Sequence, residues 1–470
     1  MTQFDYDLLC IGSGPAGQRG AVQAAKLGKR AALVERGRLI GGVCVDTGTI
    51  PSKTFREAVL LETGRVVFDR KRRSLVPGHR PNAQTLLARV AAVEQEQVGI
   101  IHDQLQRNDV TLLRGEARFQ DPHTIDVVKD GQATTVTADN VLIAVGTVPA
   151  APPGLFTQSD LVVTSDELLD ITTLPRRFAV IGAGVIGMEY ASIFAALGID
   201  VTVVDKRRHP LEFLDGELVD ELLHQMRNMG VTFLLGEAVE RLEIVERPSR
   251  HVVINLESGK RLVSELVLFS AGRHGATDRL NLSAAGLKPD DRGRLMVDQE
   301  YRTNVSHIFA AGDVIGFPSL ATTSAEQGRL AACHAFGVEA GPMAPHFPIG
   351  IYSIPEVSMV GEPEHVLTAQ KVPYESGVAR YREIARGHIM GDDSGFLKML
   401  FHREDRRLLG VHVAGTGATE LVHIGQAVLA LNGGLDYFLT TAFNYPTLAE
   451  CYKVAALDAF NKLASDQGRD

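Results

Sequence analysis

The stretch that decides the fold is GSGPAG at residues 12–17, which directly follows an apolar run, YDLLCI, at residues 6–11. An apolar run of this length is typical of a buried strand, and the Ala-rich stretch after the glycines is typical of a helix. Glycines at Gly12, Gly14 and Gly17 allow a tight turn, a close approach of the backbone to a pyrophosphate, and close packing of helix on strand. We therefore predict a strand–turn–helix unit that binds a dinucleotide.

The residues after this loop complete the pattern. The helical stretch ends at Gly28, and a second apolar run, residues 31–34, ends at Glu35. A carboxylate at this place can accept hydrogen bonds from the hydroxyls of an adenosine ribose, while the helix N-terminus meets the phosphates. We expect Glu35 and the three loop glycines to bind the same dinucleotide.

The whole unit is repeated later in the chain. GAGVIG at residues 182–187 follows another apolar run, the next helical stretch stops at Gly198, and the strand after it ends at Asp205. In both copies the helix-stopping glycine lies 16 residues after the first glycine, and the acid lies 23 residues after it. One such loop is a weak signal, because glycine-rich turns are common, but two copies in matching register predict two dinucleotide sites. The second site would use Gly182, Gly184, Gly187 and Asp205.

The composition is that of a large globular chain. Its 470 residues predict two to four domains, and 45% hydrophobic with 22% charged residues is an ordinary balance. The formal net charge of −9 argues against nucleic acid or an anionic membrane as a partner. No apolar stretch approaches the ~18 residues of a membrane span, and the first strand begins too early for a signal peptide. Four cysteines without a framework spacing predict reduced thiols, so we expect a cytoplasmic protein.

The two loops also predict how the chain is divided. The first unit ends on an apolar run at residues 141–145 followed by Gly146, and the second ends on a similar run followed by Gly272. The chain then returns to the first unit through an apolar strand that ends in Gly312-Asp313. The predicted segments are residues 1–154, 155–272, 273–344 and 345–470, of which the last lacks a phosphate loop and is expected to form an interface.

Further helices and strands are expected between these landmarks. The basic run at residues 70–73 is interpreted as a solvated turn, and residues 150–154 as a Pro-rich linker. Helical stretches are expected around residues 59–106, 322–335, 419–431 and 448–463, and strands at residues 395–401 and 408–413.

A third motif lies at residues 41–53, GGVCVDTGTIPSK. It resembles the redox loop of the flavin disulfide reductases, in which two cysteines five positions apart form a disulfide beside the flavin. The first position is Cys44 here, but the second is Thr49. Because a threonine cannot form a disulfide, the relay that passes electrons to a dithiol substrate is missing.

With these motifs the chain resembles the pyridine nucleotide-disulfide oxidoreductase family over essentially its whole length. The most specific marks are the loop at residues 41–53 and FNYPTLAE at residues 443–450. The resemblance implies an α/β fold with two Rossmann-like domains, one for FAD and one for NAD(P), and an α+β dimerisation domain at the C-terminus. It thus implies a homodimer or a higher homo-oligomer, and no metal site is expected.

The resemblance also assigns residues to the two nucleotides. It implies that the FAD site uses Gly12, Gly14, Gly17, Glu35, Lys53, Gly146 and Asp313, with Asp313 on the ribityl hydroxyls. It implies that the NAD(P) site uses Gly182, Gly184, Gly187, Asp205 and Gly272. Lys53 and Glu189 resemble the family's ion pair beside the flavin N5 and are the main catalytic candidates, as positioning groups. Cys44 is a third candidate, with a packing or tuning role on the flavin favoured over nucleophilic chemistry.

The tail shows a second departure from the disulfide reductases. Their His-Pro-Thr-x-x-Glu motif supplies an acid and a base for the dithiol, whereas Tyr445 takes the histidine position here and Glu450 is retained. Tyrosine, with an ordinary pKa near 10, is a poor base at neutral pH. The chain thus lacks both the disulfide and the histidine that would act as acid and base. This predicts FAD-mediated hydride transfer between NADPH and NAD⁺, a transhydrogenase activity in which the two nucleotides bind in turn at one nicotinamide site.

Three other functions are compatible with parts of the sequence. An NAD(P)H dehydrogenase that reduces a quinone, a dye or oxygen needs no second cysteine either. A disulfide reductase is disfavoured by Thr49 and Tyr445, and a non-catalytic flavoprotein is disfavoured by the intact Lys53 and Glu189. Asp205 followed by KRR at residues 206–208 suits both NAD and NADP, although the basic run could equally be a solvated turn.

Overall fold

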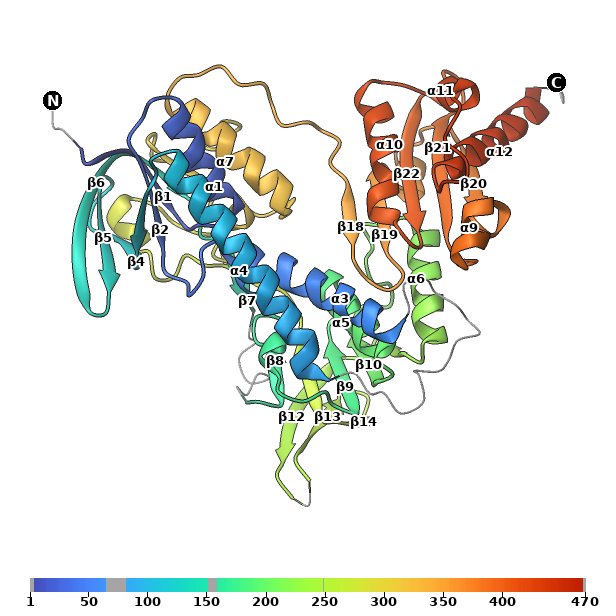
Figure 1. Ribbon diagram of the computed structural model, residues 1–470, viewed down its shortest axis with the longest axis horizontal. Helices are drawn as coiled ribbons and strands as arrows, with labels where there is room; N and C mark the ends of the chain where they lie inside the picture. Colours follow the sequence, from blue (N-terminus) through green and yellow to red (C-terminus); the bar gives the residue numbers. More distant parts are fainter. Residues whose placement is uncertain (1–3, 65–81, 151–158, 248, 468–470) are drawn as a thin grey trace.

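The computed structural model describes residues 4–64, 82–150, 159–247 and 249–467. Figure 1 shows three lobes. We call them the first unit, the second unit and the C-terminal unit. The first unit comprises residues 4–64, 82–150 and 273–344, the second unit residues 159–247 and 249–272, and the C-terminal unit residues 345–467. The basic run at residues 70–73 and most of the Pro-rich linker lie outside the described residues.

The first unit is built on a seven-stranded sheet in the order β3-β2-β1-β6-β5-β4, with β17 pairing with β6. Strands β1, β2, β3, β6 and β17 pair in parallel, and β4 and β5 continue from β6 as an antiparallel ribbon. Helices α1 (Pro15–Lys26) and α7 (Ala321–Ala335) pack against each other and against the sheet (Figure 1). The strands are β1 (Tyr6–Ile11), β2 (Ala31–Glu35), β3 (Thr111–Arg114), β4 (Glu116–Phe119), β5 (Thr124–Lys129), β6 (Gln132–Ile143) and β17 (Ile308–Ala310).

The second unit repeats the parallel arrangement in a five-stranded sheet, in the order β11-β10-β9-β15-β8. Helix α5 (Val185–Ala196) is apolar on nearly every side and is buried from Gly187 to its end, as expected for a helix enclosed by other elements. The remaining helix, α6 (Gly216–Asn228), is amphipathic and begins at the N-cap Asp215. The strands are β8 (Val162–Thr164), β9 (Arg177–Ile181), β10 (Asp200–Asp205), β11 (Thr232–Leu235) and β15 (Leu266–Phe269). An antiparallel sheet of β12 (Val239–Val245), β13 (His251–Leu256) and β14 (Arg261–Ser264) projects from the unit.

Two short strands and three helices join the units. β7 (Thr147–Pro149) leaves the first unit and pairs antiparallel with β16 (Arg273–Gly275), which returns to it. Helices α2 (Val43–Asp46) and α3 (Thr49–Thr63) follow β2, and α3 packs against both α4 (Ala83–Arg107) and α5. Residues of the first unit therefore reach the second unit.

The C-terminal unit is a five-stranded antiparallel sheet in the order β18-β19-β22-β21-β20, with α10 and α12 packed on it. Its strands are β18 (Ile349–Ile351), β19 (Val357–Gly361), β20 (Tyr374–Arg380), β21 (Phe396–His402) and β22 (Leu408–Ala414). Its helices are α8 (Glu364–Ala369), α9 (Ala385–Met390), α10 (Ala418–Ala430), α11 (Leu435–Thr440) and α12 (Glu450–Gln467). Four short 3₁₀ helices complete the described chain, η1 (Leu168–Asp170), η2 (Leu282–Ala285), η3 (Asp313–Ile315) and η4 (Tyr381–Glu383).

A buried ionic cluster anchors the second unit to the C-terminal unit. Lys398 of β21 is 1% exposed, and its ammonium bonds the carboxylate of Asp215 at 3.0 Å. It also lies 2.9 Å from Glu364 and 3.1 Å from Glu217. Because a buried ammonium is tolerated only when it is paired, this cluster fixes the start of α6 against the C-terminal sheet.

The predicted strand–turn–helix–strand pattern is confirmed twice, by β1-α1-β2 and by β9-α5-β10, and the α/β class is confirmed with it. The predicted start of the helical region at residue 59 is wrong, because α3 begins at Thr49. Its first turn contains Pro51, which lacks a backbone N–H but is tolerated in a first turn, where that N–H has no intrahelical partner. Within the described residues, no helix is long and apolar enough to cross a membrane.

Candidate functional site

The loop after β1 forms a cradle with one open position. Gly12 has φ +105°, and a Cβ there would lie 2.4 Å from the carbonyl oxygen of Ala144. A Cβ at Gly17 would lie 1.9 Å from the Gly12 carbonyl oxygen, so the helix can only approach this closely without a side chain. At Gly14, by contrast, nothing lies within 4 Å of the Cβ position. The open side of the loop is therefore at its middle glycine, at the N-terminus of α1.

Glu35, at the end of β2, lies directly behind this loop and is buried. Its Oε2 accepts hydrogen bonds from the backbone N–H of Ser13 (3.0 Å) and from the Ser13 hydroxyl (2.5 Å). Its Oε1 accepts one from the N–H of Gly37 (2.5 Å). These bonds fix the carboxylate beside the loop and leave it with acceptor capacity for further hydroxyl groups.

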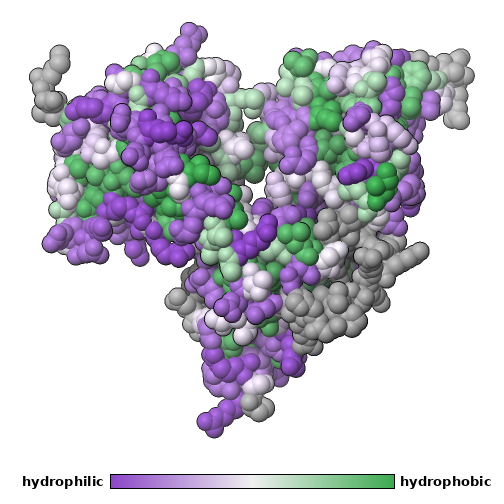
Figure 2. All heavy atoms as spheres, in the orientation of Figure 1, coloured by the Kyte–Doolittle hydropathy of each residue, from purple (hydrophilic) through white to green (hydrophobic). Residues whose placement is uncertain are grey.

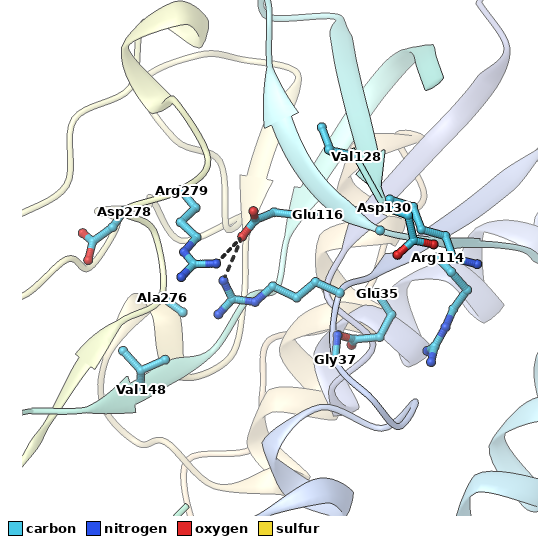
Figure 3. A pocket seen from close by; sticks show the side chains of 13 residues that line it. Glu35, Gly37, Arg114, Glu116, Val128, Asp130, Val148, Ala276, Asp278 and Arg279 are labelled. Atoms are coloured by element: carbon cyan, nitrogen blue, oxygen red, sulfur yellow. Dashed lines mark hydrogen bonds and ion pairs between the residues drawn. The ribbon is translucent and has the colours of Figure 1, made fainter. Parts of the chain in front are cut away.

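A polar cavity of about 800 Å³ adjoins Glu35 (Figure 3). At its far side Arg279 and Arg36 both reach Glu116, each at 3.3 Å. Arg114 donates to the carbonyl of Arg38 through Nη2 (2.7 Å), while its buried Nη1 has no partner among the described residues. An open glycine, a fixed acid and a cavity with an unused donor fit the adenosine diphosphate part of a dinucleotide.

The loop after β9 has the same geometry. Gly182 has φ +109°, and a Cβ there would lie 2.7 Å from the carbonyl oxygen of Ser270. A Cβ at Gly187 would lie 1.9 Å from the Gly182 carbonyl oxygen, and nothing lies within 4 Å of a Cβ at Gly184. A backbone hydrogen bond beside each loop is repeated as well. In the first unit the N–H of Ala144 donates to the carbonyl of Ile11, and in the second unit the N–H of Ser270 donates to the carbonyl of Ile181, both at 2.8 Å.

Two more predicted glycines follow the strands that end beside the loops. Gly146, after β6, has φ +64°, and Gly272, after β15, has φ +128°. Nothing lies within 4 Å of a Cβ at either position. Both glycines therefore have open space beside them, in the segments that follow β6 and β15.

The acid of the second unit is held differently. Asp205 accepts a hydrogen bond from the N–H of Ala183 (2.6 Å) and is also paired with Arg207 by two bonds, Nε to Oδ1 at 3.0 Å and Nη2 to Oδ2 at 2.7 Å. Burial alone would raise the pKa of Asp205, but the bonds from Arg207 and from the backbone lower it. The carboxylate is therefore ionised near neutral pH. Arg207 is not simply part of a solvated turn.

Cys44 and Thr49 lie side by side, on α2 and at the start of α3. Burial raises the pKa of Cys44, and the neighbouring Thr49 side chain partly offsets that rise. Asp313 and Lys53 both lie close enough to influence this thiol electrostatically. Burial also raises the pKa of Asp313, which Arg273 partly offsets. The structure therefore brings the predicted positions Thr49, Lys53 and Asp313 close to Cys44.

Lys53 and Glu189 form an ion pair between the two units. The Lys53 Nζ lies 2.5 Å from Oε2 of Glu189, and the carboxyl side chain is 6% exposed. The other oxygen, Oε1, accepts a hydrogen bond from the backbone N–H of Tyr352 at 2.9 Å. Lys53 Nζ also lies 5.1 Å from the centroid of the Tyr352 ring. The sequence interpretation missed Tyr352, which is 163 residues from Glu189 and belongs to no motif.

The two tail residues lie in the C-terminal unit. Tyr445 is 68% exposed, and Oε2 of Glu450 is buried without a partner among the described residues. No hydrogen bond or ion pair within the described chain joins either residue to Lys53 or Glu189. Within one chain the tail is thus not linked to the ion pair.

Two family models match the chain. The pyridine nucleotide-disulphide oxidoreductase model covers residues 6–328, and the dimerisation domain of the same family covers residues 347–456. The chain belongs to the pyridine nucleotide-disulphide oxidoreductase family. Members use FAD and a pyridine nucleotide, and the chain is accordingly an oxidoreductase.

Curated relatives within the family include soluble pyridine nucleotide transhydrogenases. That of Mycobacterium tuberculosis is 52% identical over 461 residues, covering 98% of each chain. That of Photobacterium profundum is 42% identical over 465 residues, covering 97% of this chain and 98% of the relative.

Solved structures of the same family have the same fold. The flavoprotein disulfide reductase RclA of Escherichia coli, in a Cu(II) complex, aligns with a TM-score of 0.88 at 25% identity over 97% of this chain and 99% of its own. LpdA of Mycobacterium tuberculosis aligns with a TM-score of 0.87 at 27% identity over 96% of this chain and 99% of its own.

Proposed function

We propose that the protein transfers a hydride between NADPH and NAD⁺, in either direction, with FAD as its resident cofactor. The observation that carries the proposal is that Thr49, and no second cysteine, neighbours Cys44 among the described residues, beside an intact Lys53–Glu189 ion pair. A thiol next to a threonine has no partner for a disulfide. The groups that suit a nicotinamide site are present, and those that suit a dithiol substrate are not. The names of the curated relatives support the same activity.

The two cradles divide the nucleotides between them. In the proposal, FAD is held in the first unit by Gly12, Gly14, Gly17, Glu35, Gly146, Asp313 and Lys53. The pyridine nucleotides bind in turn to the second unit at Gly182, Gly184, Gly187, Asp205 and Gly272. The corresponding domains are residues 1–154 with 273–344 for FAD, 155–272 for NAD(P), and 345–470 for dimerisation.

FAD supplies a ring system that can accept a hydride from one nicotinamide and return it to another. The chain supplies orientation and charge. Lys53, paired with Glu189, places an ammonium at the boundary between the units, where a nicotinamide and the flavin would meet. Cys44, whose pKa is raised by burial, stays a neutral thiol and has no base paired to it. No proton transfer is asked of the chain, because a hydride carries its own electron pair.

We propose a homodimer in which the C-terminal units meet. The match to the dimerisation domain supports it, and so do apolar side chains on the surface of this unit, such as Leu431 at 82% and Leu457 at 44% exposure. Figure 2 shows green, hydrophobic surface on this lobe among polar atoms. Tyr445 and Glu450, whose Oε2 has no partner among the described residues, would then lie near the site of the other subunit. We also propose a cytoplasmic location, because the four cysteines are free thiols.

The experiment that tests the function is a transfer assay from NADPH to thio-NAD⁺, with a quinone and a disulfide as acceptors in parallel. The expected result is fast thio-NAD⁺ reduction that requires FAD. Lys53→Met should slow it by about 10- to 1,000-fold while FAD stays bound, because a preorganised charge is lost. Reduction of the quinone or the disulfide with no thio-NAD⁺ reduction would refute the proposal.

A further inference from the structure

A loop at the start of the C-terminal unit, directly after β18, is fixed between helices of the other two units. From α5, the Ser192 hydroxyl accepts a hydrogen bond from the N–H of Ile354 at 3.0 Å. From α3, the guanidinium of Arg56 donates to the carbonyl of Ser353 (3.2 Å) and pairs with Glu356 (3.0 Å). Arg56 and Ser353 are both buried. The loop is therefore held by both nucleotide-binding units at once.

Tyr352, the first residue of this loop, contacts both members of the ion pair. Its backbone N–H occupies Oε1 of Glu189, so the lysine ammonium is directed to Oε2. Its ring lies at cation–π distance from the same ammonium, 5.1 Å from centroid to Nζ. Burial raises the pKa of the Tyr352 phenol, which keeps it neutral, and Thr419 at the start of α10 lies close enough to offset part of that rise.

These contacts define where the ammonium can lie. Besides Glu189, the ammonium reaches only the neighbouring Ser52 hydroxyl, at 3.3 Å, among the hydrogen bonds of the described residues. A quarter of the Lys53 side chain is exposed, so these two partners would leave a flexible lysine several positions. An aromatic face on a second side favours a single position, because the attraction to the ring is strong only within about 6 Å of its centre. The ring follows a backbone N–H that is itself bonded to Glu189.

We propose that Tyr352 is a positioning residue for hydride transfer, whose ring and backbone N–H fix the Lys53 ammonium at the boundary between the two nucleotide-binding units. This inference rests on the proposed function and deepens it. It gives the C-terminal unit a part in the site of its own chain, separate from any contribution across a dimer interface.

A test without a substitution at Tyr352 uses the position of the lysine itself. The lysines of the FAD-loaded protein are ¹³C-methylated, and the Lys53 methyl signal is assigned by its absence in Lys53→Arg. An amine held over a ring face has methyl protons shifted upfield of those of exposed lysines. A Lys53 signal among the exposed lysines would overturn the proposal, whatever the activity of the protein.

Kinetics then separate positioning from stability. Tyr352→Leu keeps the backbone N–H to Glu189 but removes the ring, so the upfield shift should disappear and kcat for NADPH to thio-NAD⁺ transfer should fall about 2- to 30-fold. KM should change less than about twofold, since the adenosine end is bound elsewhere. Tyr352→Phe keeps the ring and should restore both the shift and kcat.

The matched control is Tyr374→Leu, which removes a tyrosine of the same unit whose phenol bonds Thr368 and does not contact the ion pair. It should leave kcat and the Lys53 signal unchanged. An equal loss of kcat in Tyr352→Leu and Tyr374→Leu, or no rescue by Tyr352→Phe, would overturn the proposal. If the wild type transfers no hydride to thio-NAD⁺, the proposed function fails, while the methyl shift still decides whether Tyr352 holds the lysine.

Discussion

The two nucleotide-binding units share one backbone geometry and differ in what holds the acid. In each, the residue after the first glycine donates its N–H to the carboxylate, Ser13 to Glu35 at 3.0 Å and Ala183 to Asp205 at 2.6 Å. Glu35 also takes the Ser13 hydroxyl, a neutral donor, whereas Asp205 takes the guanidinium of Arg207 in a two-point ion pair.

This difference suits a resident cofactor in one unit and exchanging substrates in the other. The side chain of Arg207 is 45% exposed and can turn, whereas that of Asp205 is 5% exposed and is fixed. With Arg207 turned toward a 2′-phosphate the second unit suits NADP, and with Asp205 facing a free 2′-hydroxyl it suits NAD. The groups that bond Glu35 are all neutral, so no paired arginine has to turn away from it.

The largest expected effect comes from placing a charge on the open glycine of each unit. Gly14→Asp should yield protein without FAD and without its yellow colour, because a carboxylate against a pyrophosphate costs several kcal/mol, or at least about 100-fold in affinity. Gly184→Asp should stay yellow but lose NADPH binding to a similar degree. Absorbance at 450 nm and nucleotide titration measure the two outcomes.

Steric control variants are available, because both glycines have extended backbone angles and open space around the Cβ position. Gly14→Ala and Gly184→Ala should therefore keep much more of the binding than the aspartates. Loss of FAD in Gly184→Asp with retention in Gly14→Asp would reverse the assignment of the two units.

A second prediction concerns how many electrons the first unit stores. With Thr49 beside Cys44, anaerobic reduction should consume one equivalent of NADPH per FAD and show no long-wavelength thiolate–flavin band. Thr49→Cys places a second thiol beside Cys44 and is the informative counterpart, since a disulfide there would raise the uptake toward two equivalents. Consumption of two equivalents of NADPH per FAD by the wild type would contradict the prediction that the chain has no disulfide to store a second electron pair.

The repeat itself could be predicted from sequence because it is local. Glycines, an apolar strand and an acid at fixed intervals specify β1-α1-β2 and β9-α5-β10, each within a single short segment, residues 6–35 and 177–205. The same reasoning missed the antiparallel β12-β13-β14 sheet, whose strands carry polar residues and lie at no fixed distance from a motif. It also missed the start of α3, where a proline in the first turn obscured a helix.

The candidate site was predictable only as far as motifs reach. Lys53 and Glu189 each stand in a motif, and their ion pair is present. Sequence motifs could not identify Tyr352 as a site residue, because its contacts with Lys53 and Glu189 depend on how the C-terminal unit packs against α3 and α5. The pairing of Arg207 rather than Arg208 with Asp205 depends on the geometry of one turn, and a run of three basic residues does not specify it.

A third prediction tests the exchange between NAD and NADP in the second unit. Asp205→Ala should weaken NAD(H) more than NADP(H), and Arg207→Ala should do the reverse. One charge-assisted hydrogen bond is worth roughly 1.5–3 kcal/mol, or about 10- to 150-fold in affinity. Arg208→Ala is the neighbouring control and should have a smaller effect. KM values for both nucleotides measure this, and equal effects on the two would show that the pair does not discriminate.

The smallest effect is expected outside both units, at Tyr445. If hydride transfer needs only the two cradles and the Lys53–Glu189 pair, Tyr445→Phe should keep activity within about twofold, since no proton is asked of the hydroxyl. The residue is 68% exposed in the single chain, so the loss of one hydroxyl should not disturb folding. If the tyrosine were instead a general acid for a quinone or another substrate, the same change would lower turnover by roughly 100-fold or more. Assays with thio-NAD⁺ and with a quinone distinguish the two cases. If Tyr445→Phe loses activity only with the quinone, the tyrosine is needed for quinone reduction but not for hydride transfer between nucleotides. If it loses activity with both acceptors, the tail takes part in the chemistry.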